Sequence, residues 1–446
     1  MWTVAQLGAD LAAGRTSSRD LVEQALGRIA DKDGEGSRAF LQVNAEGARE
    51  AADYSDRLRK KGVRRSPIDG LPVSLKDLFD VAGEVTRAGS RILEKSQAKR
   101  TDAAAVARLR AAGAVFIGRT NMVEFAFGGV GLNPHYGTPR NPWERKAGRV
   151  PGGSSSGAAV AQADGMCVMA LGSDTGGSVR IPAALCGLAG LKPTARRVPL
   201  EGAFPLSFTL DSIGPLASSI GCCAAYDAVL SGEPASLPEF SVKGLRFVLP
   251  RSSLLSDLDG AVERTFGAAI ERLRKAGAIV EERPAPVFDR RSEYFARGGF
   301  AAAEAYHVHR PHLARLGECD PRVSARIHLG KDFPASDYVA LREQRGAAVR
   351  EFEALAAPFD ALVMPTVACA APTIAEAGAN DEDYARWNLR ILRDPAFVNF
   401  LDGCAATLPC HAPGAAPVGF AVCGPAMSDR RILAVAAAVE RALSRD

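Results

Sequence analysis

The sequence predicts an α/β protein, and three local patterns carry this prediction. A helix pattern over residues 260–276 stands between strand patterns at 244–249 and 277–281, which is the alternation expected of strands joined by a helix. A second helix–strand pair covers 102–112 and 115–117. The third signal is a short apolar run over 71–75 that ends at the charged pair Lys76-Asp77; it has the length and composition of a buried strand.

Further elements are expected in order along the chain. Two helices lie between Thr3 and Ala30, separated by the break at 14–18, with Ser18 as the expected N-cap of the second helix. The Gly- and Pro-rich stretch 125–157 predicts loops. The remaining helix patterns are 45–61, 158–163, a segment starting at Arg180, and 432–443, and the remaining strand patterns are 167–171 and 361–366.

Composition and charge exclude several classes of protein. Hydrophobic residues make up 47% of the 446 residues and charged residues 24%, which excludes disordered, collagenous and coiled-coil chains. The formal net charge of +4 is close to neutral for a chain of this length. The sequence therefore shows no large basic face of the kind that binds nucleic acid. We expect no membrane span, because no apolar run reaches the required length. We expect no signal peptide, because the N-terminus has no basic region leading into an apolar one. Nine cysteines without repeated spacing predict free thiols in a cytoplasmic protein rather than disulfides or a zinc site.

Two loops rich in glycine and serine are the strongest candidates for chemistry. They are GGSSSG at 152–157 and GSDTGGSVR at 172–180. Glycine lets the backbone approach a substrate closely and adopt positive φ. Successive backbone N–H groups from Thr175 to Ser178, at the start of a helix, can converge on one oxygen and stabilise an oxyanion beside the Ser178 hydroxyl. A structural or phosphate-binding turn is the alternative for either loop.

A serine nucleophile requires a base, and Lys76 is the best candidate. None of the six histidines lies in a glycine-rich or strand-end context. Burial among apolar neighbours lowers the pKa of a lysine, so that Lys76 at the end of an apolar strand can accept a proton. A lysine at an exposed strand end is the alternative explanation.

The order of these motifs resembles the amidase signature family, the serine–serine–lysine hydrolases. The resemblance rests on LPVSLKD at 71–77, the GGSSSG loop, and GSDTGGSVRIPA from Gly172 onward. It is dense from about residue 66 to 220 and thins to Met364-Pro365-Thr366 and Pro417-Val418-Gly419. Additional matches are TNMVEFA at 120–126, NPHYG at 133–137, Asn141-Pro142, GLKPT at 190–194 and DSIGPL at 211–216.

The resemblance implies the amidase signature fold, in which helices cover both faces of a mixed central β-sheet. It implies a single domain over residues 1–446, composed of an N-terminal helical region (1–62), a signature catalytic core (63–220) and a C-terminal substrate-shaping region (221–446). Ser156 departs from the family pattern, since many members carry glycine there. The last third lacks a strong family motif, so the substrate is not predicted.

The resemblance also implies a mechanism and its residues. Ser178 corresponds to the nucleophile that forms the acyl-enzyme, Ser154 to the bridging serine after a cis peptide bond, and Lys76 to the base. The N–H groups of Thr175, Gly176, Gly177 and Ser178 would hold the oxyanion, and Phe127 and Gly128 would line the acyl side of the cleft. The implied substrate is a small-molecule amide, with neither a metal ion nor an organic cofactor, and a homodimer is left open.

Two other chemistries compete with this interpretation. Residues 153–157 also spell G-x-S-x-G, the nucleophile elbow of α/β-hydrolases, with Ser155 at its centre, but the polar stretch before it does not read as the strand that an elbow requires. His307, His309 and His312 could form a metal cluster, although their spacing favours a surface or packing role. No P-loop pattern occurs.

Two alternative functions stay open on the sequence. One is the glutaminase subunit of a tRNA-dependent amidotransferase, which shares the triad but supplies ammonia to a partner. The other is a catalytically silent amidase-like scaffold, against which the presence of all three catalytic residue types argues. A stand-alone amidase is preferred, because no partner-docking motif is found in the C-terminal part.

Overall fold

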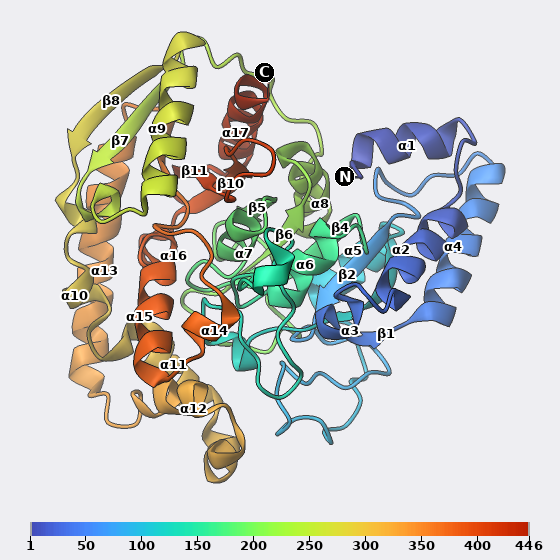
Figure 1. Cartoon of the computed structure of the whole chain (residues 1–446), viewed down its shortest axis with the longest axis horizontal. Coiled ribbons are helices and arrows are strands. Elements are labelled where there is room, and N and C mark those ends of the chain that lie inside the picture. The colour runs from blue at the N-terminus through green and yellow to red at the C-terminus, as the bar shows by residue number, and fades with distance from the viewer. Residues whose placement is uncertain (1, 445–446) are drawn as a thin grey trace.

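A computed structural model describes residues 2–444, and its centre is one 11-stranded sheet (Figure 1). The strands follow the order β1-β3-β2-β4-β6-β5-β10-β11-β9-β7-β8. β2 runs parallel to β3 and β4, and β7 runs parallel to β8 and β9, whereas the other pairs are antiparallel. The mixed sheet confirms the α/β prediction. The strands are β1 (Phe40–Val43), β2 (Pro72–Lys76), β3 (Val115–Thr120), β4 (Met169–Asp174), β5 (Ala189–Lys192), β6 (Ser212–Ala217), β7 (Arg246–Arg251), β8 (Ile279–Pro284), β9 (Ala361–Pro365), β10 (Cys404–Pro409) and β11 (Gly419–Gly424).

Seventeen α-helices are described between residues 2 and 444. They are α1 (Val4–Ala12), α2 (Ser18–Ala30), α3 (Gly36–Ala39), α4 (Ala45–Lys60), α5 (Ala104–Ala111), α6 (Ser156–Ala163), α7 (Arg180–Leu185), α8 (Ile220–Ser231), α9 (Gly260–Lys275), α10 (Arg291–Tyr294), α11 (Gly299–Val308), α12 (Pro321–His328), α13 (Ala335–Ala356), α14 (Ile374–Ala377), α15 (Asp381–Leu392), α16 (Pro395–Phe400) and α17 (Asp429–Leu443).

Most predicted elements occur close to their expected positions, with two corrections. Ser18 is not the N-cap of α2: Ser17 is the cap, and its side chain and that of Asp20 form a reciprocal capping box, which leaves Ser18 as the first helical residue. The strand expected at 167–171 starts later, at Met169, and extends to Asp174. The extension brings the end of β4 directly to the second glycine-rich loop.

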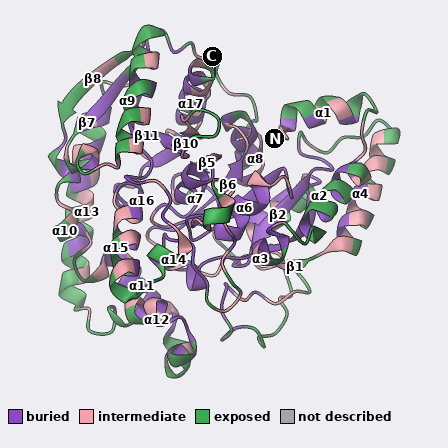
Figure 2. Ribbon diagram, viewed as in Figure 1, coloured by how far each residue is buried: buried purple, intermediate pink, exposed green. Residues whose placement is uncertain are grey.

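Alternate residues of the central strands face two hydrophobic clusters. Met169 and Leu171 of β4 belong to the cluster that includes α8 and α17, whereas Ala170 between them belongs to the cluster with α6 and α7. Successive side chains of a strand point to opposite faces, so these helices cover the two faces of the sheet. Figure 2 shows the buried residues concentrated in the central strands and the exposed ones on the outer sides of the helices.

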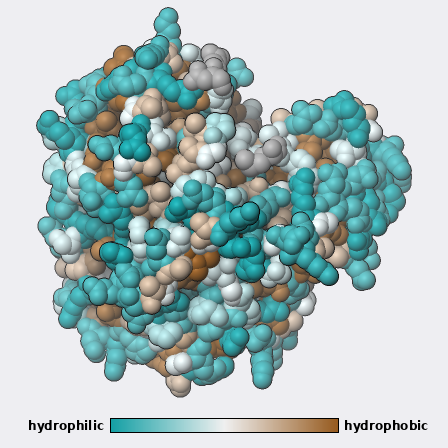
Figure 3. Space-filling model, viewed as in Figure 1, coloured by the Kyte–Doolittle hydropathy of each residue, from teal (hydrophilic) through white to brown (hydrophobic). Residues whose placement is uncertain are grey.

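The face of the molecule seen in Figure 3 is largely polar. On the face seen in Figure 3, hydrophilic residues predominate and hydrophobic residues lie in small separate groups. None of the helices within residues 2–444 combines the length and apolar character needed to cross a membrane.

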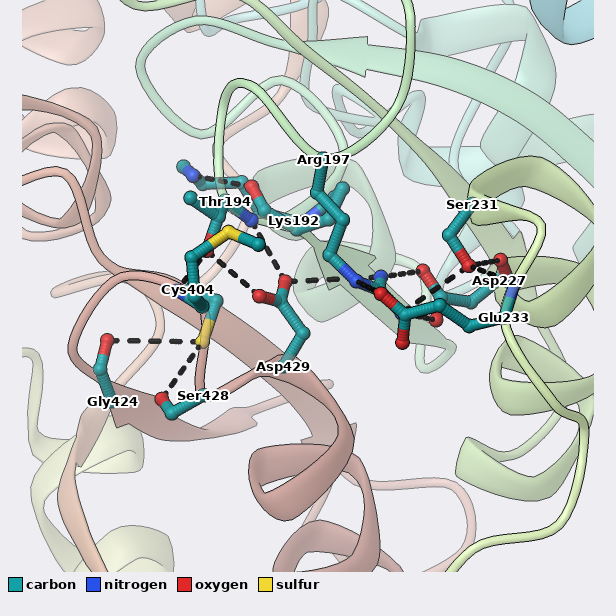
Figure 4. A network of polar contacts seen from close by, with 12 residues as sticks. Lys192, Thr194, Arg197, Asp227, Ser231, Glu233, Cys404, Gly424, Ser428 and Asp429 are labelled. Carbon is teal, nitrogen blue, oxygen red and sulfur yellow. Dashed lines mark hydrogen bonds and ion pairs between the residues drawn. The ribbon is translucent and has the colours of Figure 1, made fainter.

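A buried polar network ties the chain after β5 to α8 and to the start of α17 (Figure 4). Arg197 donates to both carboxylate oxygens of Asp227, at 2.6 and 2.8 Å, and to Glu233. Asp429 accepts hydrogen bonds from the backbone N–H and the hydroxyl of Thr194. The side chain of Arg197 is 3% exposed, so the network joins three distant segments away from water.

Replacing Arg197 by methionine is expected to cost about 3–5 kcal/mol of unfolding free energy, because a buried pair that loses one partner leaves an uncompensated charge. Urea unfolding followed by circular dichroism measures the loss. The adjacent Arg196 pairs with Asp402 while 58% exposed, so Arg196→Met should cost less than about 1 kcal/mol. Equal losses in the two variants would contradict the importance of this network.

Candidate active site

The two glycine-rich loops meet at one edge of the sheet. β2 ends at Lys76 and its parallel neighbour β4 ends at Asp174, so Lys76 and the 172–180 loop lie at the same edge of the sheet. The 172–180 loop continues from β4 into α7, and the 152–157 loop leads into α6, whose residues contact β2 and β4. The 172–180 loop is therefore held by β4 itself, whereas α6 holds the 152–157 loop against the same two strands.

Lys76 is fully buried, and its amine contacts two serine hydroxyls. Nζ lies 2.7 Å from Oγ of Ser154 and 2.9 Å from Oγ of Ser173. Burial lowers the pKa of Lys76 to about 7, even though the negative charges of Asp174 and Asp211 act in the opposite direction. A neutral amine has two N–H groups and one lone pair, so it can donate to Ser173 while accepting a proton from Ser154.

The 152–157 loop presents Ser154 to this amine. The peptide bond between Gly153 and Ser154 is cis, as the resemblance implied. The Gly153 N–H donates to the carbonyl of Gly129, and the Ser154 carbonyl accepts from the Val123 N–H. The next residue, Ser155, donates its N–H to the carbonyl of Ser178 at 3.3 Å. This last bond joins the Ser154 loop to the Ser178 turn.

A single carboxylate organises the turn that carries Ser178. Asp174 accepts from the N–H groups of Gly177 and Val179, from Nε and Nη2 of Arg180, and from the amide of Asn399. Burial would raise the pKa of Asp174, but the charge of Arg180 and these hydrogen bonds hold it well below its usual range. Asp174 is therefore a permanent anion around which the turn closes.

The same turn leaves backbone donors for a ligand. The N–H of Gly177 is engaged by Asp174, so it is not available in this geometry. Those of Thr175, Gly176 and Ser178 donate to no other group in the described part of the chain. Gly177 has φ of +123°, and a Cβ there would lie 2.7 Å from Ile181 and 2.8 Å from Pro395, so glycine is required at this position.

Asp211 holds the first residue of the turn. Its carboxylate accepts from the hydroxyl of Thr175 and from the N–H groups of Leu206 and Ser207. Burial raises the pKa of Asp211 to about 6, although these hydrogen bonds lower it. The side chain is thus a second acidic group near Lys76.

A cavity of about 250 Å³ opens in front of Ser178. Its wall contains Ser178, Thr175 and Gly176 on one side, and Phe127 and Gly128 on another. The structure therefore brings the residues expected to line the acyl side of the cleft to the same cavity as the serine. The C-terminal part of the chain supplies most of the remaining wall, including Phe300, Asn388, Leu392, Ala396 and Phe400.

The competing chemistries find little support in the geometry. Residues 121–155 contain two short 3₁₀ turns and no β-strand, so Ser155 does not follow the strand of a nucleophile elbow. Its buried hydroxyl has no hydrogen-bond partner within residues 2–444. His309 packs edge-on against Phe125 at 4.4 Å and bonds the carbonyl of Ala305. Within residues 2–444, no three His, Cys, Asp or Glu side chains are grouped to hold a metal ion.

Sequence reasoning assigned no role to several residues of the site. Four of them lie within the motifs named above: Ser173, Asp174, Arg180 and Asp211. The motifs indicated that these residues are near the site, but they did not indicate which groups the side chains contact. Asn399 carries no local signal, because its partner Asp174 is 225 residues away.

Comparison with known proteins places these features in context. The family model Amidase matches residues 20–433. The chain is 38% identical over 419 residues to a 2-amino-5-chloromuconic acid deaminase of Comamonas testosteroni, covering 90% of this chain and 88% of the relative. It is also 42% identical over 289 residues to a glutamyl-tRNA(Gln) amidotransferase chain of Anaeromyxobacter sp. (strain K), covering 62% of this chain and 58% of that relative.

A solved structure matches nearly the full length of the chain. A crystal structure of an amidase superposes with a TM-score of 0.87 at 32% identity and covers 99% of both chains. The similarity includes the C-terminal part, where the sequence motifs are weak.

Proposed function

Because the chain belongs to the amidase family and is a hydrolase of C–N amide bonds, we propose that it acts through an acyl ester on Ser178, with Ser154 and Lys76 moving the proton. The observation that carries this proposal is the buried Lys76 amine, 2.7 Å from the Ser154 hydroxyl and with a pKa of about 7. An amine in this state can act as a base near neutral pH.

The proposed reaction begins with proton transfer through the two serines. Ser178 Oγ attacks the amide carbon while its proton passes to Ser154, and the proton of Ser154 passes to Lys76. The tetrahedral intermediate then breaks its C–N bond, and the proton returns through Ser154 to the leaving amine. Water hydrolyses the ester by the same relay, which releases the acid and restores Ser178.

The oxyanion of the intermediate would be held by backbone N–H groups of the turn at 175–178. Thr175, Gly176 and Ser178 have free N–H groups at the cavity, which supports their assignment. Gly177 was assigned the same role from the resemblance. Its N–H already donates to Asp174, so we propose that Gly177 acts mainly by permitting the positive φ of the turn.

A small-molecule amide is the proposed substrate, with its acyl part in the cavity beside Phe127 and Gly128. The modest cavity volume of about 250 Å³ supports a small acyl group. All nine cysteines are free, which supports a reducing compartment such as the cytoplasm. The proposal leaves open that two copies of the chain form a homodimer.

A second candidate is the glutaminase component of an amidotransferase, favoured by the similarity to the glutamyl-tRNA(Gln) amidotransferase chain. Hydrolysis of glutamine alone, stimulated by a co-purifying partner, would support it. Turnover of other small amides by the isolated chain would support the stand-alone amidase.

Replacing Ser178 by alanine should abolish the acyl-enzyme and reduce turnover to below about a hundredth of wild type, since the nucleophile is removed. Mass spectrometry of enzyme quenched during turnover detects the acyl adduct, and ammonia release measures turnover. Ser155→Ala is the matched control, because it removes the neighbouring hydroxyl that a nucleophile elbow would use.

Residual activity in Ser178→Ala above about a hundredth of wild type, or loss of activity only in Ser155→Ala, would contradict the assignment of Ser178 as the nucleophile. Failure of the folded wild-type protein to hydrolyse any amide would favour a binding scaffold.

The dependence on pH should report Lys76. Below about pH 7 the amine is protonated, so kcat/KM should rise about tenfold per pH unit and level off above that value. The rise goes with increasing pH because the deprotonated form is the base. Lys76→Ala should lose most of its activity together with this inflection. An unchanged inflection in the Lys76→Ala profile would remove Lys76 from the proton relay.

A further inference from the structure

Two arginines line the cavity in front of Ser178, and neither has an acidic partner. Arg291 of α10 and Arg326 of α12 are both part of its wall. Neither guanidinium forms an ion pair within the described residues, although arginines beside them do. Arg290 pairs with Glu351, and Arg322 pairs with Asp320 at 2.7 Å. Of these four arginines, the two without an ion pair in the described part of the chain are those at the cavity.

Arg326 is fixed at the side of the cavity that contains Phe127 and Gly128. Its Nη1 donates to the carbonyl of Phe127 at 2.7 Å, and its guanidinium lies over the ring of Tyr384 at 5.3 Å. A Cβ on Gly128 would lie 3.4 Å from the same nitrogen. One carbonyl occupies only part of a group with five N–H donors, so the others are available to a ligand.

Arg291 lies across the segment that borders the Ser178 turn. Its Nη1 donates to the carbonyl of Arg393 at 2.8 Å, and Leu392 and Ala396 on either side of that segment approach Gly176. Burial lowers the pKa of Arg291, although Asp394 acts in the opposite direction. The Asp394 carboxylate is bound by Arg393 at 2.6 Å, so it does not neutralise Arg291 by direct contact.

The apolar remainder of the cavity wall would strengthen the interaction of Arg291 and Arg326 with an anion. This remainder includes Leu206, Leu210, Phe300, Leu392 and Phe400. Charges in such surroundings are poorly screened by water, and guanidinium–carboxylate hydrogen bonds are among the strongest in proteins. A neutral acyl group would leave both cations without a counter-charge.

We propose that the substrate is an amide whose acyl part carries a carboxylate, and that Arg291 and Arg326 bind this carboxylate. The proposal rests on the proposed role of Ser178 and specifies the chemical class of its substrate. A monoamide of a short dicarboxylic acid is the simplest molecule of this class. Arg291 and Arg326 are then specificity-determining residues, while Ser178, Ser154 and Lys76 perform the chemistry.

The test compares ammonia release from glutaramate and from pentanamide, which have the same number of carbons and differ in the terminal carboxylate. Wild type should prefer glutaramate by about tenfold or more in kcat/KM, since a hydrogen bond to a charged group contributes about 1.5–3 kcal/mol. Arg291→Gln and Arg326→Gln should each reduce this preference, mainly through KM for glutaramate. Arg386→Gln is the matched control: Arg386 lies on α15 and pairs with Asp383, and it is not part of the cavity wall.

A binding measurement keeps the test decisive if a variant folds poorly. Calorimetry with glutarate and the Ser178→Ala protein should show binding that Arg326→Gln or Arg291→Gln, added to that protein, weakens by about tenfold. Equal kcat/KM for the two amides in wild type, or absence of glutarate binding, overturns the carboxylate proposal. Ammonia release from pentanamide that depends on Ser178 would then still support the proposed amidase mechanism. Ammonia release that persists in Ser178→Ala would contradict the role of Ser178 without testing the binding of the carboxylate, which the glutarate measurement tests separately.

Discussion

The site depends on the exclusion of water from the amine of Lys76. Lys76, the last residue of β2, is fully buried with its amine against the hydroxyls of Ser154 and Ser173, and this burial lowers its pKa to about 7. An exposed lysine with an ordinary pKa near 10.4 would be protonated at neutral pH and could not accept a proton. Burial at the end of β2 is therefore what makes this lysine usable as a base.

Two nearby carboxylates oppose the effect of burial on the pKa of Lys76. Asp174 and Asp211 both favour the charged form of Lys76. Asp174 is itself saturated by Arg180, Asn399 and the backbone of the turn. The Asp174 carboxylate thus shapes the Ser178 turn and, together with Asp211, raises the pKa of Lys76 against the effect of burial.

The sequence was most informative where the signals are local. The α9 helix and the strands on either side of it follow from periodicity, and Lys76, Ser154 and Ser178 follow from ordered motifs. Strands such as β5 (AGLK) and β11 (GFAVCG) were not predicted, because they are short and their small buried residues show no alternation. Arg291 and Arg326 gave no signal either. They stand out because both lie in the cavity wall and neither forms an ion pair with another described residue, and only the tertiary structure shows this.

The protonation state of Lys76 can be measured directly. Lysine labelled with ¹³C at Cε gives a chemical shift that follows the charge of the amine, and Lys76→Met identifies the signal. A transition near pH 7 is expected for Lys76. A signal that stays in the charged form up to about pH 10, as for an exposed lysine, would contradict its role as the base.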